Sequence, residues 1–354
     1  MSKKIIAVTR HLPGVVETLS EYGEVRSAPP GAELDKADLI ALMSDADAVL
    51  TTAWDNIDAE VISACPKLRL ICNTGVGYNN IDIAAARLRK IMVTNTPGVT
   101  DDAVADLAMG LMIAVARRLP QADVFVRSGQ WTKATLVGFG LGQDVSGKTL
   151  GIVGFGRIGQ TLAKRAQGFD MTVLYHARRP VSAETESLYK ARHSTLDKLL
   201  GDSDFVVLLV PYSVETHHII GTEQLKKMKP SAFLVNVARG GVVDDQALAV
   251  ALKAGALAGA ALDCVENEPD LHPELFGLAN VIFSPHIGSA TPGTRRTMVS
   301  MSTKNLIAGI TGKTPPNLIP LPGQASNKGV PRSDDVHLRN GELANHRNEE
   351  GGRA

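Results

Sequence analysis

The sequence has few cysteines, no excess of charge of either sign and no long hydrophobic run. Its 354 residues include three cysteines, Cys65, Cys72 and Cys264. An odd and sparse set excludes a disulfide framework, and the gap between the first two matches no usual zinc motif. We therefore expect buried, reduced thiols and no metal site.

The balance of charge and the short apolar runs exclude further classes of protein. Lys+Arg and Asp+Glu number 37 each, so the formal net charge is zero. This argues against a nucleic-acid binder that works by neutralising phosphates, although a local basic pocket stays possible. No stretch approaches the roughly 18 apolar residues of a membrane span, and the run after Lys3 and Lys4 is too short for a signal peptide. We predict a soluble, cytoplasmic protein without a membrane or nucleic-acid partner.

The composition that is present is globular, with 44% hydrophobic and 21% charged residues. The length favours two domains. Short apolar runs alternate with amphipathic stretches, which predicts βαβ units and parallel sheets. In the first part of the chain we expect strands at 4–9, 47–51 and 68–73, and helices at 12–22 and 57–64.

A long helix is predicted over residues 101–128, because apolar residues recur there at helical spacing. A second series of strands follows, at 149–153, 172–175, 204–209, 232–237, 258–262 and 281–284. Six strands is the count of a complete doubly wound dinucleotide domain. A further helix is expected at 291–309. The polar segment 323–354 is predicted to be disordered, as a natural tail or a vector-derived remnant.

The strongest local motif is Gly154-Phe155-Gly156-Arg157-Ile158-Gly159. It follows a predicted strand and opens a predicted helix, which is the context that a dinucleotide fingerprint requires. The first glycine permits a tight turn, the second lets a pyrophosphate approach the backbone, and the third lets the helix pack on the strand. The amides at the helix start then face the phosphates.

The next predicted strand ends in Tyr175-His176-Ala177-Arg178-Arg179. A site that prefers NAD usually has an acid at this position, where it binds the ribose 2′-hydroxyl. This chain has two arginines instead, and a guanidinium suits a 2′-phosphate. The alternative is a solvated surface pair of arginines.

Three later segments, 236–241, 263–269 and 284–289, each follow a predicted strand and bring Arg239, Glu268 and His286 to one sheet edge. Such a set suits reduction of a 2-oxo acid. The arginine can bind the carboxylate and polarise the ketone, the histidine can deliver a proton, and a carboxylate beside the histidine keeps it protonated. By residue type alone, Glu266 is as good a candidate as Glu268.

These segments carry a family resemblance. GIVGFGRIGQ, NVARGGVVDD, LDCVENEP and SPHIGSAT resemble the D-2-hydroxyacid dehydrogenase family, over roughly residues 5 to 320. Within it, YHARRP is similar to the NADPH-dependent glyoxylate/hydroxypyruvate and 2-ketogluconate reductase branch. Two features depart from the family pattern. Cys264 stands where valine is more usual, and the segment from 323 onward has no counterpart.

The resemblance implies an α/β fold of two Rossmann-like lobes, with a doubly wound dinucleotide-binding domain inserted in a split flavodoxin-like substrate domain. The substrate domain would comprise 1–101 and 290–322, and the NAD(P)-binding domain 102–289. A homodimer formed through the dinucleotide-binding domain is also implied.

The resemblance further implies the roles of individual residues. Arg239 would bind the substrate, Glu268 would pair with the proton donor His286, and the amides of Val76 and Gly77 would hold the substrate carboxylate. The implied cofactor-binding residues are Val104, Gly154, Gly156, Arg157, Ile158, Gly159, Arg178, Arg179, Val210, Pro211, Thr216, Val237, Ala238, Arg239, Asp263, His286 and Gly288.

The predicted function is NADPH-dependent reduction of glyoxylate, hydroxypyruvate or 2-ketogluconate to the D-2-hydroxy acid, with NADH as a possible second cofactor. Two alternatives stay open. The family includes a nucleotide-sensing corepressor that can retain the same three residues. It also includes phosphite and formate dehydrogenases, although the formate enzymes lack the glutamate that Glu268 supplies here.

Overall fold

The computed structural model describes residues 3–12 and 14–319, so the predicted disordered segment 323–354 lies outside the described residues. The chain divides into two compact units. Unit 1 consists of the described residues up to Thr100 together with those from Pro292 to Ile319, and unit 2 is Asp101–Thr291.

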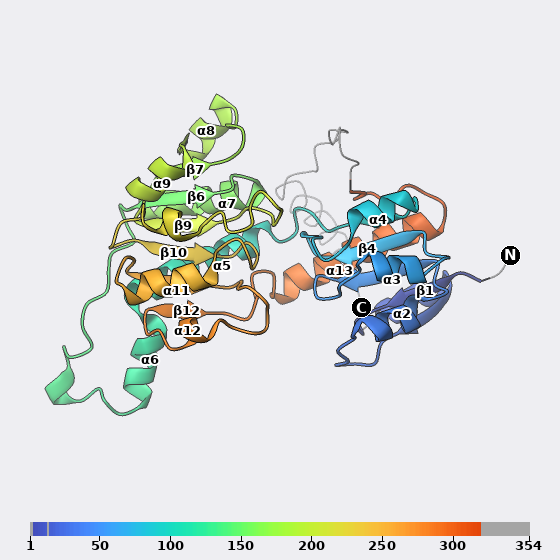
Figure 1. The fold of residues 1–354 in the computed structure, drawn as a ribbon, viewed down its shortest axis with the longest axis horizontal. Helices are drawn as coiled ribbons and strands as arrows, with labels where there is room; N and C mark the ends of the chain where they lie inside the picture. Colours follow the sequence, from blue (N-terminus) through green and yellow to red (C-terminus); the bar gives the residue numbers. More distant parts are fainter. Residues whose placement is uncertain (1–2, 13, 320–354) are drawn as a thin grey trace, which may run out of the picture. The chain divides into compact units, whose positions relative to one another are not determined.

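Unit 1 contains a five-stranded parallel sheet in the order β2-β1-β3-β4-β5 (Figure 1). This is the strand order of flavodoxin-like folds. Its strands are β1 (Ile5–Val8), β2 (Glu24–Ser27), β3 (Ala48–Thr52), β4 (Leu70–Thr74) and β5 (Met92–Thr94). Its helices are α1 (Val15–Ser20), α2 (Lys36–Met43), α3 (Ala59–Ala64), α4 (Ile83–Leu88) and α13 (Pro292–Ile310).

Both faces of the unit 1 sheet are covered, which explains why its central strands are almost continuously apolar. Helices α1 and α13 bury Leu19 and Leu306 against one face, and α2, α3 and α4 cover the other. The last helix is also fixed by polar contacts, since the Thr74 hydroxyl donates to the Ser302 hydroxyl at 3.1 Å. Helix α13 thus completes the fold that the first hundred residues begin.

Unit 2 contains a seven-stranded parallel sheet in the order β12-β11-β10-β9-β6-β7-β8. Its strands are β6 (Thr149–Val153), β7 (Thr172–His176), β8 (Ala191–His193), β9 (Phe205–Leu208), β10 (Phe233–Asn236), β11 (Gly259–Leu262) and β12 (Val281–Phe283). Its α-helices are α5 (Asp101–Arg117), α6 (Leu119–Arg127), α7 (Arg157–Ala166), α8 (Ala183–Tyr189), α9 (Leu196–Asp202), α10 (Thr222–Leu225), α11 (Asp245–Lys253) and α12 (Pro273–Phe276).

Two apolar layers sandwich this sheet. Helices α5 and α7 pack on one face with the aromatic rings of Phe155 and Tyr175, and α9 to α12 pack on the other (Figure 1). Short 3-10 turns at Lys133–Thr135 and Gln167–Phe169 complete the unit. The predicted α/β architecture with two parallel-sheet domains is confirmed.

Two predictions about individual elements are wrong. The helix predicted over 101–128 is two helices, because Arg118 adopts a left-handed backbone with φ 54° between α5 and α6. Pro120 explains the break, since its ring would clash with the carbonyl four residues earlier in a continuous helix. The sheet also has a seventh strand, β8, at its edge. That strand has only three residues, two of them exposed and basic, so no apolar pattern marks it.

Helix α6 and the segment that follows it project away from the rest of unit 2 (Figure 1). We call residues 119–143 the arm. Several large apolar side chains of the arm face solvent, and Val137 and Leu141 are each 94% exposed. Among the described helices, none has both the length and the apolar character needed to cross a membrane.

Candidate active site

The predicted cofactor and catalytic residues of unit 2, apart from Val104 on α5, follow the carboxyl ends of six strands. All strands of this sheet run parallel, so these ends share one edge, which is where open α/β sheets bind ligands. The glycine motif follows β6, the arginine pair follows β7, and Val210, Pro211 and Thr216 follow β9. Residues 237–239, 263–268 and 286–288 follow β10, β11 and β12.

The glycine loop has the shape that a dinucleotide needs. Gly154 has φ 103°, and a Cβ there would lie 2.7 Å from the Leu209 carbonyl. A Cβ at Gly159 would collide with the Gly154 carbonyl oxygen. At Gly156, by contrast, a Cβ would meet nothing, so open space adjoins the backbone just before α7. The residues present therefore fit a pyrophosphate placed against the start of that helix.

The turn after β7 is held by a tyrosine. The Tyr175 hydroxyl accepts a hydrogen bond from the Val181 amide at 3.0 Å and donates one to the Glu186 carboxylate at 2.8 Å. Its ring stacks on Phe155 of the glycine loop, with 4.1 Å between centroids. This contact fixes the turn that carries the two arginines beside the glycine loop.

Both arginines of that turn are exposed, and neither forms an ion pair within the described part of the chain. They differ in their surroundings. Arg178 lies near Glu215 in the loop after β9. The pKa of Glu215 is lowered mainly by a hydrogen bond with Ser213 and further by the charge of Arg178. The charge of Arg178 therefore acts on the loop that carries the next predicted cofactor residues.

The loop after β9 is closed by Thr216. Its hydroxyl donates to the Pro211 carbonyl at 2.7 Å and accepts from the Ser213 amide at 2.8 Å. The predicted residues Pro211 and Thr216 thus belong to one rigid turn.

A histidine–carboxylate pair lies at the end of the sheet. His286 Nδ1 and Glu268 Oε2 are 2.7 Å apart, and both side chains are largely buried. The other Glu268 oxygen accepts from the Val265 amide at 3.1 Å. One carboxylate oxygen is thus fixed by the backbone while the other holds the imidazole.

Asp263 has a role that the sequence did not reveal. It is 3% exposed, and its carboxylate accepts hydrogen bonds from the Ser284 hydroxyl at 2.6 Å and from the Ile287 and Gly288 amides, each at 2.9 Å. These contacts hold the loop on which His286 sits. A Cβ at Gly288 would lie 3.3 Å from both Asp263 and Val104, so the predicted residue on α5 also adjoins this loop.

Arg239 sits on a turn that a buried asparagine organises. The Asn236 side-chain amide donates to the carbonyls of Arg239 at 3.1 Å and Cys264 at 2.9 Å, and its oxygen accepts from the Ala238 amide at 3.1 Å. The ends of β10 and β11 are thereby tied together. Asn236 was not among the predicted site residues, although a polar residue at the end of an apolar strand was a visible signal.

Cys264 links the arginine to the histidine–carboxylate pair. Its sulfur and the nearest ligating atoms of Glu268 and His286 all lie within 4.8 Å of one another. Burial raises the pKa of the Cys264 thiol, the Glu268 charge raises it further, and the positive charge of Arg239 lowers it. The charge of Arg239 thus acts on the thiol that lies beside the Glu268–His286 pair.

Val76 and Gly77 belong to unit 1, in the loop after β4. Their carbonyls are engaged, by the side-chain amides of Asn95 at 2.8 Å and Asn73 at 2.7 Å. Within the described residues neither of their own amides donates a hydrogen bond. Both amides are thus able to bind an anion.

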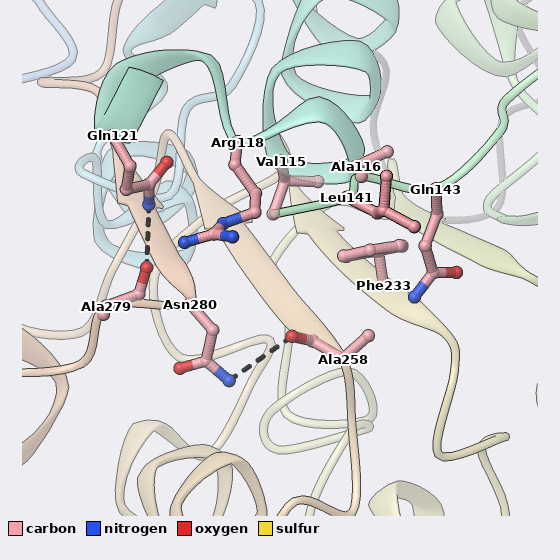
Figure 2. Close-up of a pocket in the computed structure, with 11 residues that line it drawn as sticks. Val115, Ala116, Arg118, Gln121, Leu141, Gln143, Phe233, Ala258, Ala279 and Asn280 are labelled. Carbon is pink, nitrogen blue, oxygen red and sulfur yellow. Dashed lines mark hydrogen bonds between the residues drawn. The ribbon is translucent and has the colours of Figure 1, made fainter. Parts of the chain in front are cut away.

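A pocket of about 330 Å³ lies at the opposite, amino-terminal edge of the unit 2 sheet. Two hydrogen bonds join residues of its lining (Figure 2): Gln121 donates to the Ala279 carbonyl at 2.7 Å and Asn280 to the Ala258 carbonyl at 3.4 Å. Arg118, between α5 and the arm, and Leu141 of the arm also line the pocket. Because it is remote from the carboxyl ends of the strands, this pocket is separate from the candidate active site.

Comparison with known proteins identifies the family. The model of the D-isomer specific 2-hydroxyacid dehydrogenase, NAD binding domain, matches residues 109–288. A glyoxylate reductase of Thermococcus gammatolerans is 48% identical over 321 residues, which cover 90% of this chain and 96% of that protein. The chain belongs to the D-isomer specific 2-hydroxyacid dehydrogenase family. It is therefore an oxidoreductase that acts on the CH–OH group of a hydroxy acid, as predicted.

Solved structures of this dehydrogenase family agree with the fold. A glyoxylate reductase from Paecilomyes thermophila is 33% identical with a TM-score of 0.82, over 90% of this chain and 99% of that one. An NADPH-dependent glyoxylate/hydroxypyruvate reductase from Sinorhizobium meliloti, in complex with NADP and malonate, is 34% identical with a TM-score of 0.81, over 90% of this chain and 97% of that one. The segment that matches the NAD-binding model of the family falls within unit 2.

Proposed function

We propose that the protein reduces a small 2-oxo acid, with glyoxylate as the first candidate, to the 2-hydroxy acid at the expense of NADPH. The observation that carries the proposal is the 2.7 Å pair of His286 and Glu268 at the sheet edge that also holds Arg239 and the glycine loop. Unit 2 is proposed to bind the cofactor and to supply the three reacting side chains, and unit 1 to supply backbone amides for the substrate carboxylate.

Each of the three side chains has a distinct role in the proposed reaction. The Arg239 guanidinium binds the substrate carboxylate and polarises the ketone oxygen. Glu268 occupies Nδ1 of His286, so Nε2 delivers the proton to that oxygen. The negative charge of Glu268 stabilises the imidazolium and fixes the ring. When bound, the reduced nicotinamide would supply the hydride.

The amides of Val76 and Gly77 are proposed to bind the substrate carboxylate. Their carbonyls are held by Asn95 and Asn73, and among the described residues the two N–H groups have no acceptor. Backbone amides in this state suit an anion.

Arg178 is proposed to favour NADPH over NADH. Its guanidinium has no ion-pair partner among the described residues and lies near the loop after β9, where its charge acts on Glu215. The 2′-phosphate of NADPH would bind this guanidinium. The Sinorhizobium meliloti relative, named NADPH-dependent and solved with NADP, supports this proposal.

The substrate proposal rests on the names of relatives. The Thermococcus gammatolerans and Paecilomyes thermophila proteins are named glyoxylate reductases, and the Sinorhizobium meliloti protein a glyoxylate/hydroxypyruvate reductase. The deciding experiment measures NADPH oxidation with glyoxylate, hydroxypyruvate, 2-ketogluconate and pyruvate. The highest kcat/KM is expected with glyoxylate. Turnover of 2-ketogluconate alone would move the protein to that branch, and turnover of none would overturn the proposal.

A homodimer is proposed on the strength of the arm. The exposed apolar side chains of residues 119–143 are costly in water, and a second copy of unit 2 would cover them. The cytoplasmic location predicted from the sequence remains a prediction.

A further inference from the structure

A second histidine–carboxylate pair lies on the same loop as Glu268. His218 Nε2 and Glu266 Oε1 are 2.6 Å apart, and their side chains are 35% and 25% exposed. Glu266 is two residues before Glu268 and, in the structure, does not bind His286. We propose that His218 and Glu266 are positioning residues that fix the loop on which the proposed catalytic groups depend. This inference rests on the proposed function.

The pair joins three loops at the carboxyl edge of the sheet. The second Glu266 oxygen accepts from the Asp245 amide at 3.4 Å, and the Glu266 amide donates to the Asp245 carboxylate at 2.9 Å. The His218 amide donates to the Gly241 carbonyl at 2.8 Å. Asp244 lies 3.9 Å from the other ring nitrogen of His218. The loops after β9, β10 and β11 are therefore bound to one another through this single cluster.

Val265, the neighbour of Glu266, is the residue whose backbone meets both the Arg239 turn and Glu268. A Cβ at Gly240 would collide with the Val265 carbonyl oxygen, so the turn that carries Arg239 rests directly on that carbonyl. The Val265 amide, which belongs to the preceding peptide group, donates to Glu268 at 3.1 Å. A shift of the Val265 backbone would displace Arg239 and Glu268 together. Since His218 holds the side chain of Glu266, the next residue, it controls that shift without touching the substrate.

The alternative is a metal ion bound by His217, His218 and Glu266, because their ligating atoms lie within 4.8 Å of one another. The ring geometry argues against it. The two imidazoles are stacked, with 3.9 Å between centroids and 24° between planes. The lone pairs of a ring lie in its own plane, so two nearly parallel rings cannot both direct one at the same ion.

The test uses two substitutions that each keep half of the imidazole. His218→Gln places an amide nitrogen close to Nε2 and can still donate to Glu266, whereas His218→Asn reaches only the position of Nδ1. We expect His218→Asn to lower kcat/KM for the 2-oxo acid by about tenfold to a hundredfold, the usual cost of a displaced reacting group. KM for the 2-oxo acid should rise because Arg239 is displaced, and kcat should fall because Glu268 is displaced from His286. His218→Gln should restore both, and NADPH affinity should stay unchanged in either variant. His217→Gln, beside it in the chain, is the matched control and should behave as wild type.

Hydrogen exchange gives a second readout that does not depend on turnover. The amides of residues 264–268 should exchange faster in His218→Asn than in wild type and at the wild-type rate in His218→Gln. If wild type is active and both variants match it in kinetics and in exchange rates, the positioning role is overturned while the proposed function still stands. Equal losses in both variants, in proportion to a fall in melting temperature, would make His218 a general stabiliser instead. If wild type reduces no 2-oxo acid, the proposed function fails, and the exchange rates still decide whether His218 fixes the loop.

Discussion

The side chains of the candidate active site owe their positions to short hydrogen bonds with neighbouring loops. Glu268 is fixed by the Val265 amide, and the His286 loop is fixed by three donors to Asp263. Motifs in the sequence indicated which residue types meet at this edge. They did not indicate that Asp263 holds the loop. An aspartate after a strand has the same sequence pattern whether its carboxylate binds the backbone or a ligand.

The choice between the two acids of that loop shows a similar limit. Glu266 and Glu268 are two residues apart and equal in chemistry, so composition could not rank them, and only the family resemblance favoured Glu268. The structure pairs Glu268 with His286 and Glu266 with His218. The partner of each acid depends on how loops from different strands meet, which no local pattern records.

Substitution of Glu268 should slow reduction by removing the group that fixes His286. Glu268 Oε2 lies 2.7 Å from His286 Nδ1, and the other carboxylate oxygen is held by the Val265 amide. Glu268→Ala leaves the imidazole without this contact, so kcat for the 2-oxo acid should fall by about tenfold to a hundredfold, the usual cost of a displaced reacting group. The measurement is steady-state kinetics of both proteins with glyoxylate and NADPH. Equal kcat values would remove Glu268 from the proposed mechanism.

Substitution of the two arginines should separate their roles in cofactor choice. A hydrogen bond to a charged group contributes about 1.5–3 kcal/mol, which corresponds to roughly a tenfold to hundredfold preference for NADPH. Arg178→Ala should raise KM for NADPH by about that factor and leave KM for NADH nearly unchanged. Arg179→Ala is the matched control, because Pro180 favours an extended backbone that directs its side chain to solvent. Unchanged cofactor ratios in both variants would leave the arginines as surface charge.

At the scale of elements, the sequence was most informative where a local rule and the fold agree. The strand Thr149–Val153, the glycine turn and the start of α7 were all predicted, because three glycines in that spacing fit few other structures. The break at Arg118 was missed because apolar residues continue at helical spacing up to Val115, although Pro120 indicated a helix boundary nearby. Strand β8 was missed because an edge strand needs little apolar surface.

The first turn of α11 contains a carboxylate whose ionisation opposes folding. Asp245 is 2% exposed, and burial raises its pKa from 3.8 to about 6, with the nearby Glu266 charge adding to the effect. A carboxyl with a raised pKa destabilises the fold once it is charged, so this cost grows as pH rises from 3.8 to about 6. Asp245→Asn should therefore stabilise the protein at pH above that range by on the order of 1 kcal/mol, a gain of about 2–4 °C in melting temperature.

The control for this prediction is Asp244→Asn, next to it in the chain. Asp244 caps α11 by accepting from the Ala247 amide, and asparagine caps equally well. Melting temperatures across the pH range should show the Asp245→Asn gain fading in acid and no comparable trend for Asp244→Asn. A gain that persists at pH below 3.8 would show that the charge is not its cause.

At the scale of the whole molecule, the two units with parallel sheets could be predicted from the sequence, whereas the arm could not. The alternation of strands and helices predicted both sheets, and the family resemblance implied the split of the first domain. The arm is different, because its exposed apolar residues have no regular spacing. Only the structure shows that Val137 and Leu141 remain in solvent after the unit has folded.

The oligomeric state should depend on the arm. Val137→Glu combined with Leu141→Glu places two charges on the surface that a second copy would bury, and burial of unpaired charge is strongly unfavourable. We expect wild type to sediment as a dimer and the double variant as a monomer. Leu88→Glu, an exposed apolar residue of α4 in unit 1, is the control and should remain dimeric. Monomeric wild type, or a dimeric double variant, would contradict the assignment of the arm.

The central claim is that this chain reduces a 2-oxo acid by proton donation from His286. The most direct measurement is the rate at which NADPH is consumed with glyoxylate, by wild type and by His286→Ala at the same pH. We expect turnover by wild type with one hydroxy acid formed for each NADPH lost, and a fall of about 10²–10⁴-fold in the variant. Absence of turnover in wild type, or an equal rate in His286→Ala, would contradict the account.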